Sequence, residues 1–323
     1  MKIVYMGTPE FAVAALEAII KAGHEVAAVF TQPDKAKGRS KALVPTPVKA
    51  KAMEYNIPVY QPEKLRDEEN VSLLREIAPE AIVVAAYGQL LPEAILNIPK
   101  YGCINIHASL LPKYRGAAPI ERAIIDGEKK TGVTTMYMEK GLDTGDIIEM
   151  SETDIEDDDT GETLRYRLAD MGARLIISTL DKLYNNTADR IKQDDSQSTY
   201  ASMLNKDMGK IDFTKDASAI ERLIRGLIPW PCAYTYICGR STKIYKAGVR
   251  EMNDTLKSEL LSKSPELKFV PGEIIEITKK TFTVMCGRDA LVIYNLQPEG
   301  KKAMDTVAFL NGNKLEPGML AGA

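Results

Sequence analysis

The sequence predicts an α/β protein with an open, mostly parallel, Rossmann-like sheet, followed by a small OB-like β-barrel. Up to about residue 184, short apolar runs alternate with amphipathic stretches of helical length, which is the pattern of a parallel sheet. The stretch from 189 to 200 is polar and lacks hydrophobic periodicity, as a linker does. Beyond residue 205, several short strands are separated by glycine-containing and charged turns, which favours a small barrel.

The composition is that of a soluble globular protein with enough apolar material for more than one core. The chain has 323 residues, of which 45% are hydrophobic and 27% charged. No apolar run approaches the roughly 18 residues of a membrane span. Residues 7–10, GTPE, interrupt the first apolar run too early for a signal peptide. We therefore expect a cytoplasmic protein. The cysteines at 103, 232, 238 and 286 form no C-x-x-C pair, so we expect reduced thiols and no metal.

The first elements form a strand, helix, strand unit. Residues 2–6 are a short apolar strand, and Thr8 and Pro9 offer an N-cap and a first helical residue for a helix to about Ala22. A second strand covers 25–31, so the two strands are expected to be parallel. The turn after the first strand lacks G-x-G-x-x-G, and no Walker A motif occurs, which excludes a nicotinamide or ATP site of those kinds.

Residues 31–51 form a basic, proline-punctuated segment with a single acid, Asp34. One interpretation is a solvated loop. The other is a mobile arm that binds phosphates, and it is favoured because the segment leaves the carboxyl end of a parallel strand, where open sheets bind ligands. The basic residues are Lys35, Lys37, Arg39, Lys41, Lys49 and Lys51.

The candidate catalytic residues follow a further pair of helices (48–55 and 63–77) and strands (57–60 and 81–86). Asn105 and His107 are two apart in an apolar strand, so their side chains project from the same face. An amide donor beside an imidazole suits a carbonyl carbon that passes through an oxyanion and exchanges a proton. A hydrogen-bonded structural histidine is the alternative interpretation.

Asp143 is the third candidate, in the glycine-bracketed turn GLDTGD after another apolar run. Its carboxylate could orient the imidazole or accept a proton from it. We expect a helix over 119–126, strands over 133–138 and 147–151, and a long helix to about 184.

The C-terminal part is the basic half of an acidic protein. Residues 206–323 carry 18 Lys and Arg against 14 Asp and Glu, a net charge of +4, whereas the remaining 24 and 31 give −7. Its expected elements are a helix over 217–227 and strands over 233–237, 241–247, 272–278, 281–285 and 291–296.

The motif N-x-H-x-S-L-L-P followed by G-x-D-T-G resembles the active site of enzymes that use 10-formyltetrahydrofolate. The whole chain is similar to the methionyl-tRNA formyltransferase family, through GTPEFA, TQPDKAKGR, AAYGQLLP, INIHASLLPKYRGAAPI, GLDTGDI, MLNKDMGKIDF and IRGLIPWPCAY. Tyr114 stands where that family commonly has Trp, and Cys232 where Gly is usual. Glycinamide ribonucleotide transformylases resemble the first part only, and formyltetrahydrofolate hydrolases carry an extra domain before it.

The resemblance implies a formyltransferase fold with a catalytic domain at 1–188, a linker at 189–205 and an OB-like tRNA-binding domain at 206–323. It implies transfer of a formyl group from 10-formyltetrahydrofolate to the α-amino group of initiator methionyl-tRNA, for translation initiation, without a metal. Asn105 would stabilise the oxyanion, His107 would donate a hydrogen bond or carry a proton, and Asp143 would orient the imidazole.

The remaining implied roles concern the two substrates. The folate pocket would be formed by Tyr87, Gly88, Gln89, Leu90, Ser109, Leu110, Leu111 and Pro112. The tRNA would be held by Lys35, Lys37, Arg39 and Lys41. A plain strand-to-helix turn explains residues 87–92 equally well. Two alternative functions stay open: a sugar-nucleotide N-formyltransferase with the same folate donor, and a non-catalytic RNA-binding protein, which would not explain why the three polar residues coexist.

Overall fold

The computed structural model describes residues 1–37 and 42–322. Within them the chain divides into two compact units, each built from separate stretches of sequence. Unit 1 comprises Met1–Pro119, Lys130–Asp154 and Thr163–Ser202. Unit 2 comprises Ile120–Lys129, Ile155–Glu162 and Met203–Ala323. The stretch expected as a linker therefore belongs, as far as residue 202, to the compact unit that holds the large sheet.

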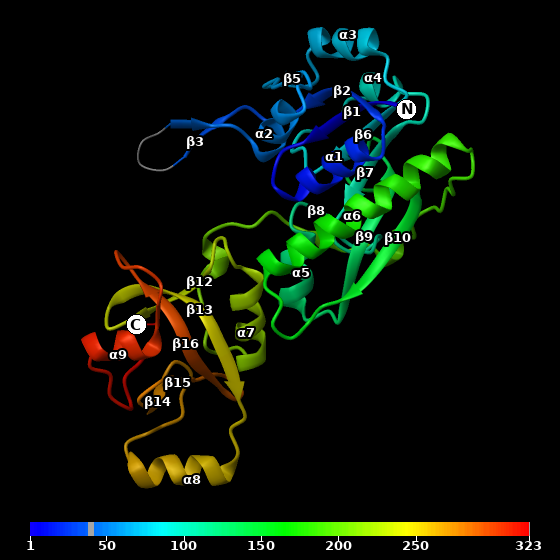
Figure 1. Ribbon diagram of the computed structural model, residues 1–323. Coiled ribbons are helices and arrows are strands. Elements are labelled where there is room, and N and C mark those ends of the chain that lie inside the picture. The colour runs from blue at the N-terminus through cyan, green and yellow to red at the C-terminus, as the bar shows by residue number, and fades with distance from the viewer. Residues whose placement is uncertain (38–41, 323) are drawn as a thin grey trace. The chain divides into compact units, whose positions relative to one another are not determined.

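The sheet of unit 1 is open and mostly parallel, as the sequence predicts (Figure 1). Its strand order is β10-β9-β7-β6-β1-β2-β5. The strands from β7 to β5 are parallel, whereas β9 is antiparallel to β7 and β10 antiparallel to β9. The strands are β1 (Lys2–Gly7), β2 (Glu25–Phe30), β5 (Val59–Tyr60), β6 (Ala81–Ala85), β7 (Cys103–His107), β9 (Lys130–Tyr137) and β10 (Ile147–Asp154).

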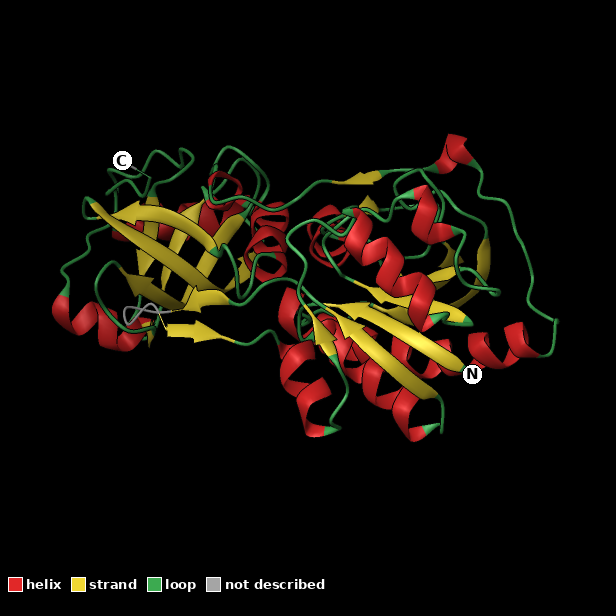
Figure 2. Cartoon of the chain, turned by 90° about the horizontal axis from the view of Figure 1, so that it is seen from above, coloured by secondary structure: helices red, strands yellow, loops and turns green. Residues whose placement is uncertain are grey.

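Helices cover both faces of this sheet (Figure 2). Strand β1 shows why, because its successive side chains point to opposite faces and are buried on both. Val4 and Met6 are buried in the cluster that contains Leu74 of α3 and Ile95 of α4. Tyr5 points to the other face, where its hydroxyl donates to the carbonyl oxygen of α1 residue 12 at 2.5 Å. The helices of unit 1 are α1 (Phe11–Lys21), α2 (Pro47–Glu54), α3 (Glu68–Ile77), α4 (Glu93–Leu96) and α6 (Gly161–Tyr184).

The expected N-cap of the first helix is wrong. Helix α1 begins at Phe11 with Glu10 at the N-cap position. Thr8 instead donates its hydroxyl to the carbonyl oxygen of Tyr87 at 2.9 Å and accepts from the Gln32 amide at 3.3 Å. The hydroxyl thus satisfies backbone groups at the ends of neighbouring strands rather than an N–H of the helix.

The basic segment contains a short antiparallel ribbon in place of an irregular loop. Strands β3 (Lys35–Lys37) and β4 (Ala42–Val44) pair and project from the sheet (Figure 1). Thr46 caps α2 by accepting from the Lys49 amide at 3.1 Å. Lys49 also binds Asp34 at 2.6 Å, so this lysine is held at the base of the ribbon.

Unit 2 is a small antiparallel domain with the strand order β12-β13-β16-β15-β14, and β17 pairs with β16. The C-terminal segment connects the two edge strands, because Gly318 N donates to Ile274 O of β14 and Gly322 N to Tyr236 O of β12. This arrangement is OB-like, as expected, although the described strands form an open antiparallel path rather than the closed barrel that was expected. The sequence did not indicate α8 or α9. The elements are α5 (Pro119–Asp126), α7 (Ala217–Gly226), β12 (Ala233–Ile237), β13 (Arg240–Arg250), α8 (Asp254–Lys263), β14 (Ile274–Ile277), β15 (Phe282–Met285), β16 (Ala290–Pro298), β17 (Met304–Asp305) and α9 (Thr306–Gly312).

Two features are absent from the part of the chain that the structure describes. No helix there is both long and apolar enough to cross a membrane. No group of three or more His, Cys, Asp or Glu side chains there could hold a metal ion.

Candidate active site

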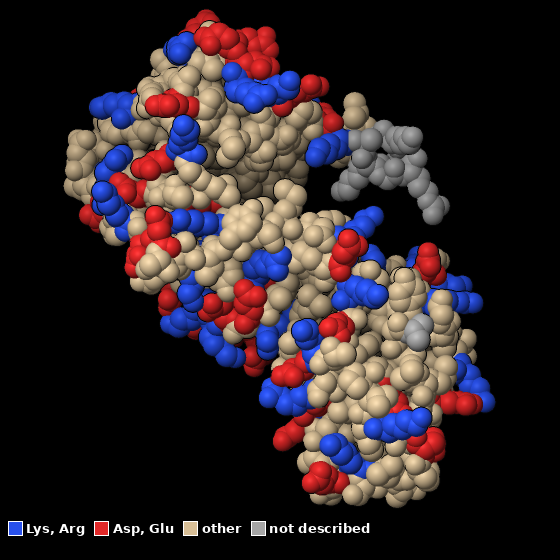
Figure 3. All heavy atoms as spheres, turned by 180° about the vertical axis from the view of Figure 1, so that it is seen from behind, with Lys and Arg blue, Asp and Glu red and all other residues tan. Residues whose placement is uncertain are grey.

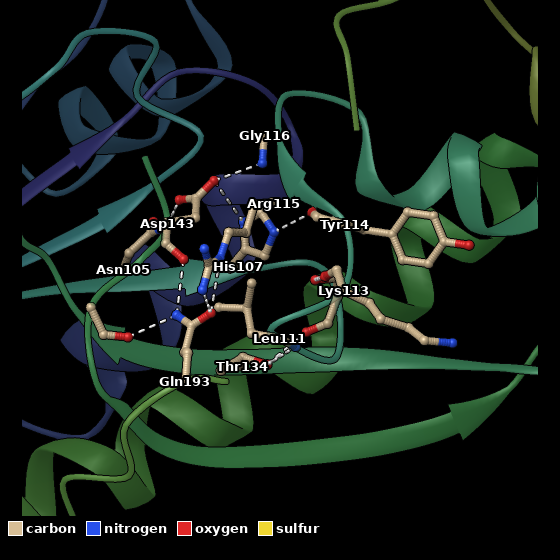
Figure 4. A network of polar contacts seen from close by, with 12 residues as sticks. Asn105, His107, Leu111, Lys113, Tyr114, Arg115, Gly116, Thr134, Asp143 and Gln193 are labelled. Atoms are coloured by element: carbon tan, nitrogen blue, oxygen red, sulfur yellow. Dashed lines mark hydrogen bonds and ion pairs between the residues drawn. The ribbon is translucent and has the colours of Figure 1, made fainter. Parts of the chain in front are cut away.

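The three polar residues singled out in the sequence converge in unit 1 (Figure 4). Asn105 and His107 lie at the carboxyl end of β7, and both are buried. The Asn105 amide donates to Asp143 Oδ1 at 3.3 Å, and His107 Nδ1 lies 3.8 Å from Asp143 Oδ2. The strand alternation therefore aims both side chains at one carboxylate, which reaches them from the loop between β9 and β10.

The orientation of the imidazole is set by a backbone carbonyl. His107 Nε2 lies 2.9 Å from the carbonyl oxygen of Tyr114, which can only accept a hydrogen bond. Nε2 therefore carries a proton, and in the neutral ring Nδ1 holds the lone pair. The distance of 3.8 Å from Nδ1 to Asp143 is too long for a direct hydrogen bond.

The loop that carries Asp143 is tightly folded. Asp143 has a φ of 51°, in the left-handed region that non-glycine residues adopt at a cost. Its Oδ2 accepts from the Gly116 amide at 2.8 Å. At Gly145 a Cβ would lie 1.9 Å from the Tyr137 carbonyl oxygen, so only glycine permits this approach.

Two further residues support the loop, and the sequence did not indicate them. The Gln193 amide nitrogen donates to the carbonyl oxygens of Asp143 at 2.9 Å and Gly145 at 2.8 Å. Arg115 donates to Gln193 Oε1 from Nε at 3.0 Å and from Nη2 at 2.8 Å. Gln193 lies in the polar stretch between 189 and 200, where only a linker was expected.

The same stretch also holds the loop after β7. Thr199 Oγ1 accepts from the Tyr114 amide at 2.8 Å, and β11 (Tyr200–Ala201) pairs in parallel with β8 (Arg115–Gly116). The loop that contains Tyr114, whose carbonyl oxygen contacts the imidazole, is thus hydrogen-bonded to a stretch about 85 residues further along the chain.

Comparisons with known proteins agree with this architecture. Residues 1–180 match the family model described as formyl transferase, and residues 203–314 match that of the formyl transferase C-terminal domain. A methionyl-tRNA formyltransferase of Lachnospira eligens is 53% identical over 322 residues, and the alignment covers 100% of both chains. The chain belongs to the methionyl-tRNA formyltransferase family. The family expectation, including a formyl-transferring enzyme, is confirmed.

Other members of the family and more distant structures extend the comparison. The methionyl-tRNA formyltransferase of Alkaliphilus oremlandii is 49% identical, again over 100% of both chains. A solved sugar 3N-formyl transferase, WlaRD, has a TM-score of 0.64 at 22% identity and covers 94% of this chain and 99% of its own. An N-formyltransferase of Helicobacter canadensis gives the same TM-score and identity, over 91% of this chain and 99% of its own. At that identity the solved structures show the common fold.

The residues expected to line a formyl-donor pocket differ in their exposure and in whether their polar groups are hydrogen-bonded. The Tyr87 hydroxyl is buried and has no hydrogen-bond partner among the described residues, and Leu90 is 74% exposed. Gly88 has a positive φ of 89° at the turn after β6. The Gln89 amide is occupied, because it accepts from Leu65 N at 2.7 Å and donates to the carbonyl oxygen of residue 62 at 2.9 Å.

The second expected group of pocket residues shapes the loop after β7. Ser109 is buried and donates to the Lys113 carbonyl oxygen at 2.7 Å. Leu111 is buried in a small cluster with Met136 and Ile147, whereas Leu110 and Pro112 are half-buried. Leu111 N also donates to the Thr134 hydroxyl at 3.3 Å (Figure 4).

The expected phosphate-binding residues lie in or beside the ribbon. Lys35 is exposed at the start of β3. The backbone of Lys37 ends β3. Arg39 and Lys41 lie outside the described residues.

Proposed function

We propose that this chain transfers the formyl group of 10-formyltetrahydrofolate to the α-amino group of initiator methionyl-tRNA, which gives N-formylmethionyl-tRNA for translation initiation. The convergence of Asn105, His107 and Asp143 carries the proposal, since it places an amide, an imidazole and a carboxylate at one point. Relatives of full length and about half identity that bear the name methionyl-tRNA formyltransferase support the choice of acceptor.

Asn105 is proposed to stabilise the oxyanion. Attack of the neutral amine on the formyl carbon places negative charge on the formyl oxygen. The Asn105 amide has two N–H groups, and only one of them is needed for the 3.3 Å contact with Asp143. The other can donate to the oxyanion, at a buried position where such a bond is stronger than in water.

His107 is proposed to accept the proton of the attacking amine. The Tyr114 carbonyl holds the proton on Nε2, so Nδ1 is the basic atom of the ring. Transfer to Nδ1 gives an imidazolium whose new N–H faces Asp143 Oδ2. The carboxylate stabilises this cation, and the proton can then return to the leaving folate nitrogen.

The folate site is proposed at residues 87–90 and 109–112. The exposed Leu90 offers an apolar contact for a flat ligand, and the buried Tyr87 hydroxyl has no hydrogen-bond partner among the described residues. Ser109 and Gln89 serve indirectly, because their side chains hold the backbone of these two segments. No metal has a role in this scheme.

The tRNA is proposed to bind through Lys35, Lys37, Arg39 and Lys41 and through the basic tail, with domains at 1–188 and 206–323 joined by 189–205. On the face shown in Figure 3, Lys and Arg are interspersed with Asp and Glu, and no large patch of one sign is visible. Two exposed lysines of the tail lie beside one glutamine. Lys243 lies opposite Gln297 in the β13–β16 register, and Gln297 donates to the Lys301 carbonyl oxygen.

One comparison tests the proposed function. The purified protein is given 10-formyltetrahydrofolate with charged initiator tRNA, charged elongator methionine tRNA or a nucleotide-linked amino sugar, and formylated product is measured. We expect formylation of the charged initiator tRNA and none of the amino sugar. Formylation of the amino sugar alone would establish the sugar N-formyltransferase alternative, and absence of folate turnover with every acceptor would favour an RNA-binding protein.

A further inference from the structure

Gln193 connects the stretch before residue 202 to the catalytic loop. Its side chain lies between two groups of atoms: the carbonyl oxygens of Asp143 and Gly145 on one side and the Arg115 guanidinium on the other (Figure 4). We propose that Gln193 is a positioning residue for formyl transfer, which holds Asp143 in place, and that Arg115 fixes its amide. This inference rests on the proposed function, because it assumes the role of Asp143.

A primary amide is the group that these surroundings require. The two carbonyl oxygens can only accept hydrogen bonds, and the guanidinium can only donate them. With the amide reversed, its oxygen would face two carbonyl oxygens and its NH₂ would face a cation, so the partners determine the orientation. A carboxylate at position 193 could pair with Arg115 but could not donate to Asp143, and an aliphatic side chain could do neither.

The Asp143 loop needs such a support because its backbone is strained. Asp143 adopts a positive φ of 51°, which an unrestrained aspartate would leave for a more favourable conformation. Gln193 restrains the main-chain oxygen of Asp143, and the side chain of Asp143 contacts Gly116 and Asn105. Without this restraint the backbone of Asp143 could leave its positive φ, and that change would carry the carboxylate away from His107.

Arg115 is itself well fixed. Its side chain is only 11% exposed, and besides Gln193 it contacts Asp195, whose side chain is 82% exposed. A contact to so exposed a partner adds little stability. Of the contacts that Arg115 makes, the two hydrogen bonds that it donates to Gln193 Oε1 are therefore the ones that fix the amide.

The test uses the full-length protein with Gln193→Glu and Gln193→Leu. Gln193→Glu keeps the pairing with Arg115 and so protects folding, but removes both hydrogen bonds to the loop. The matched controls are Gln197→Glu and Gln197→Leu, since Gln197 lies in the same stretch, is exposed, and donates to Asp194 at 2.9 Å rather than to the Asp143 loop. Circular dichroism and thermal melting verify folding of each variant.

Two readouts distinguish positioning from general damage. The first is formylation kinetics: kcat should fall by about 10- to 100-fold in both Gln193 variants, because a misplaced catalytic group loses rate on that scale, while KM for methionyl-tRNA changes by less than about threefold. The second is the imidazole NMR spectrum. The chain has two histidines, so the ring signals of His107 should move in Gln193→Glu while those of His24 stay in place.

The outcomes separate this inference from the proposed function. A kcat within about twofold of the wild type, with unmoved His107 signals, would overturn the inference, and so would a rise in KM at constant kcat, which would make Gln193 a substrate contact. Equal losses in the Gln197 controls would also overturn it. If the wild-type protein formylates no tRNA while the His107 signals move only in the Gln193 variants, the positioning stands and the proposed function fails.

Discussion

His107 Nε2 lies 2.9 Å from the carbonyl oxygen of Tyr114, whose amide in turn donates to Thr199. The ring is thus oriented by the loop that follows its own strand, and that loop is held by a distant stretch of chain. Because the carbonyl keeps the proton on Nε2, the other nitrogen is left to act as a base toward the substrate. The tautomer of the neutral imidazole is therefore determined by backbone geometry.

Replacing His107 should remove proton transfer without unfolding the chain. We expect His107→Ala to lower kcat by roughly 100-fold or more, because general base catalysis contributes on that scale. His24→Ala is the control, since this half-buried residue lies beside the N-terminal amine at 3.4 Å. Steady-state formylation of methionyl-tRNA is the measurement. Near-normal turnover of the His107 variant would refute the assigned role.

The amide of Asn105 should be equally important for charge stabilisation. Asn105→Ala removes the proposed oxyanion donor and should lower kcat by about 100- to 1,000-fold, the loss typical of such a donor. Folate binding, measured by fluorescence titration, should change little, because the donor acts mainly in the transition state. A rise in KM at unchanged kcat would instead make Asn105 a residue of ground-state binding.

Gly145 tests the packing of the Asp143 loop. A Cβ there would lie 1.9 Å from the Tyr137 carbonyl oxygen, a backbone atom that cannot move away cheaply. We expect Gly145→Ala to lower kcat strongly and to cost about 1–3 kcal/mol of unfolding free energy through overpacking. Gly312→Ala is the control, because a Cβ at this site meets no atom of the described residues within 4 Å. Urea denaturation and kinetics measure both effects, and equal behaviour of the two variants would contradict the packing argument.

The convergence of Asn105 and His107 was predictable because its signal is local. A run such as CINIH has strand periodicity, and two side chains two positions apart share a face in any strand. The mostly parallel sheet and the strand-rich tail likewise follow from apolar runs that are short and regularly spaced, whereas the strand order β10-β9-β7-β6-β1-β2-β5 was not predicted. Asp143 needed the resemblance as well, because nothing within its turn shows which strand end the carboxylate will reach.

The residues that were missed have partners far along the chain. Gln193 contacts Asp143, 50 residues away, from a stretch without hydrophobic periodicity, which reads as a linker. Thr8 looked like a helix cap, but its partner is the Tyr87 carbonyl, 79 residues away. In α8 the one buried residue is Leu260, so its sequence carries little apolar pattern. A local sequence pattern does not show which distant backbone group still needs a hydrogen-bond partner.

The thiols should differ sharply in reactivity. Cys238 is exposed, whereas Cys103, Cys232 and Cys286 are buried. Burial raises the pKa of the Cys103 and Cys286 thiols to about 12, so both stay protonated at pH 8. We expect one thiol to react rapidly with a disulfide reagent at pH 8 and three more only in denaturant. Peptide mapping identifies the labelled residue, and rapid labelling of Cys103 in the native protein would contradict the buried strand.

The last prediction concerns the lysines near Gln297 in the tail. Lys243 and Lys301 are exposed and lie next to the same glutamine, so they are candidates for contacts with tRNA phosphates. Each phosphate contact releases counterions and adds roughly 0.7–0.9 to the slope of log affinity against log salt. Lys243→Glu and Lys301→Glu should therefore weaken tRNA binding and make that slope shallower by about 1 each. Lys263→Glu, at an exposed lysine paired with Glu259, is the control. Phosphate contacts fix the position of a tRNA but do not depend on its sequence, so initiator and elongator tRNA should lose affinity alike.

Filter binding across a salt series measures both the affinity and the slope for each variant. An unchanged slope in both variants would exclude these lysines from the tRNA interface.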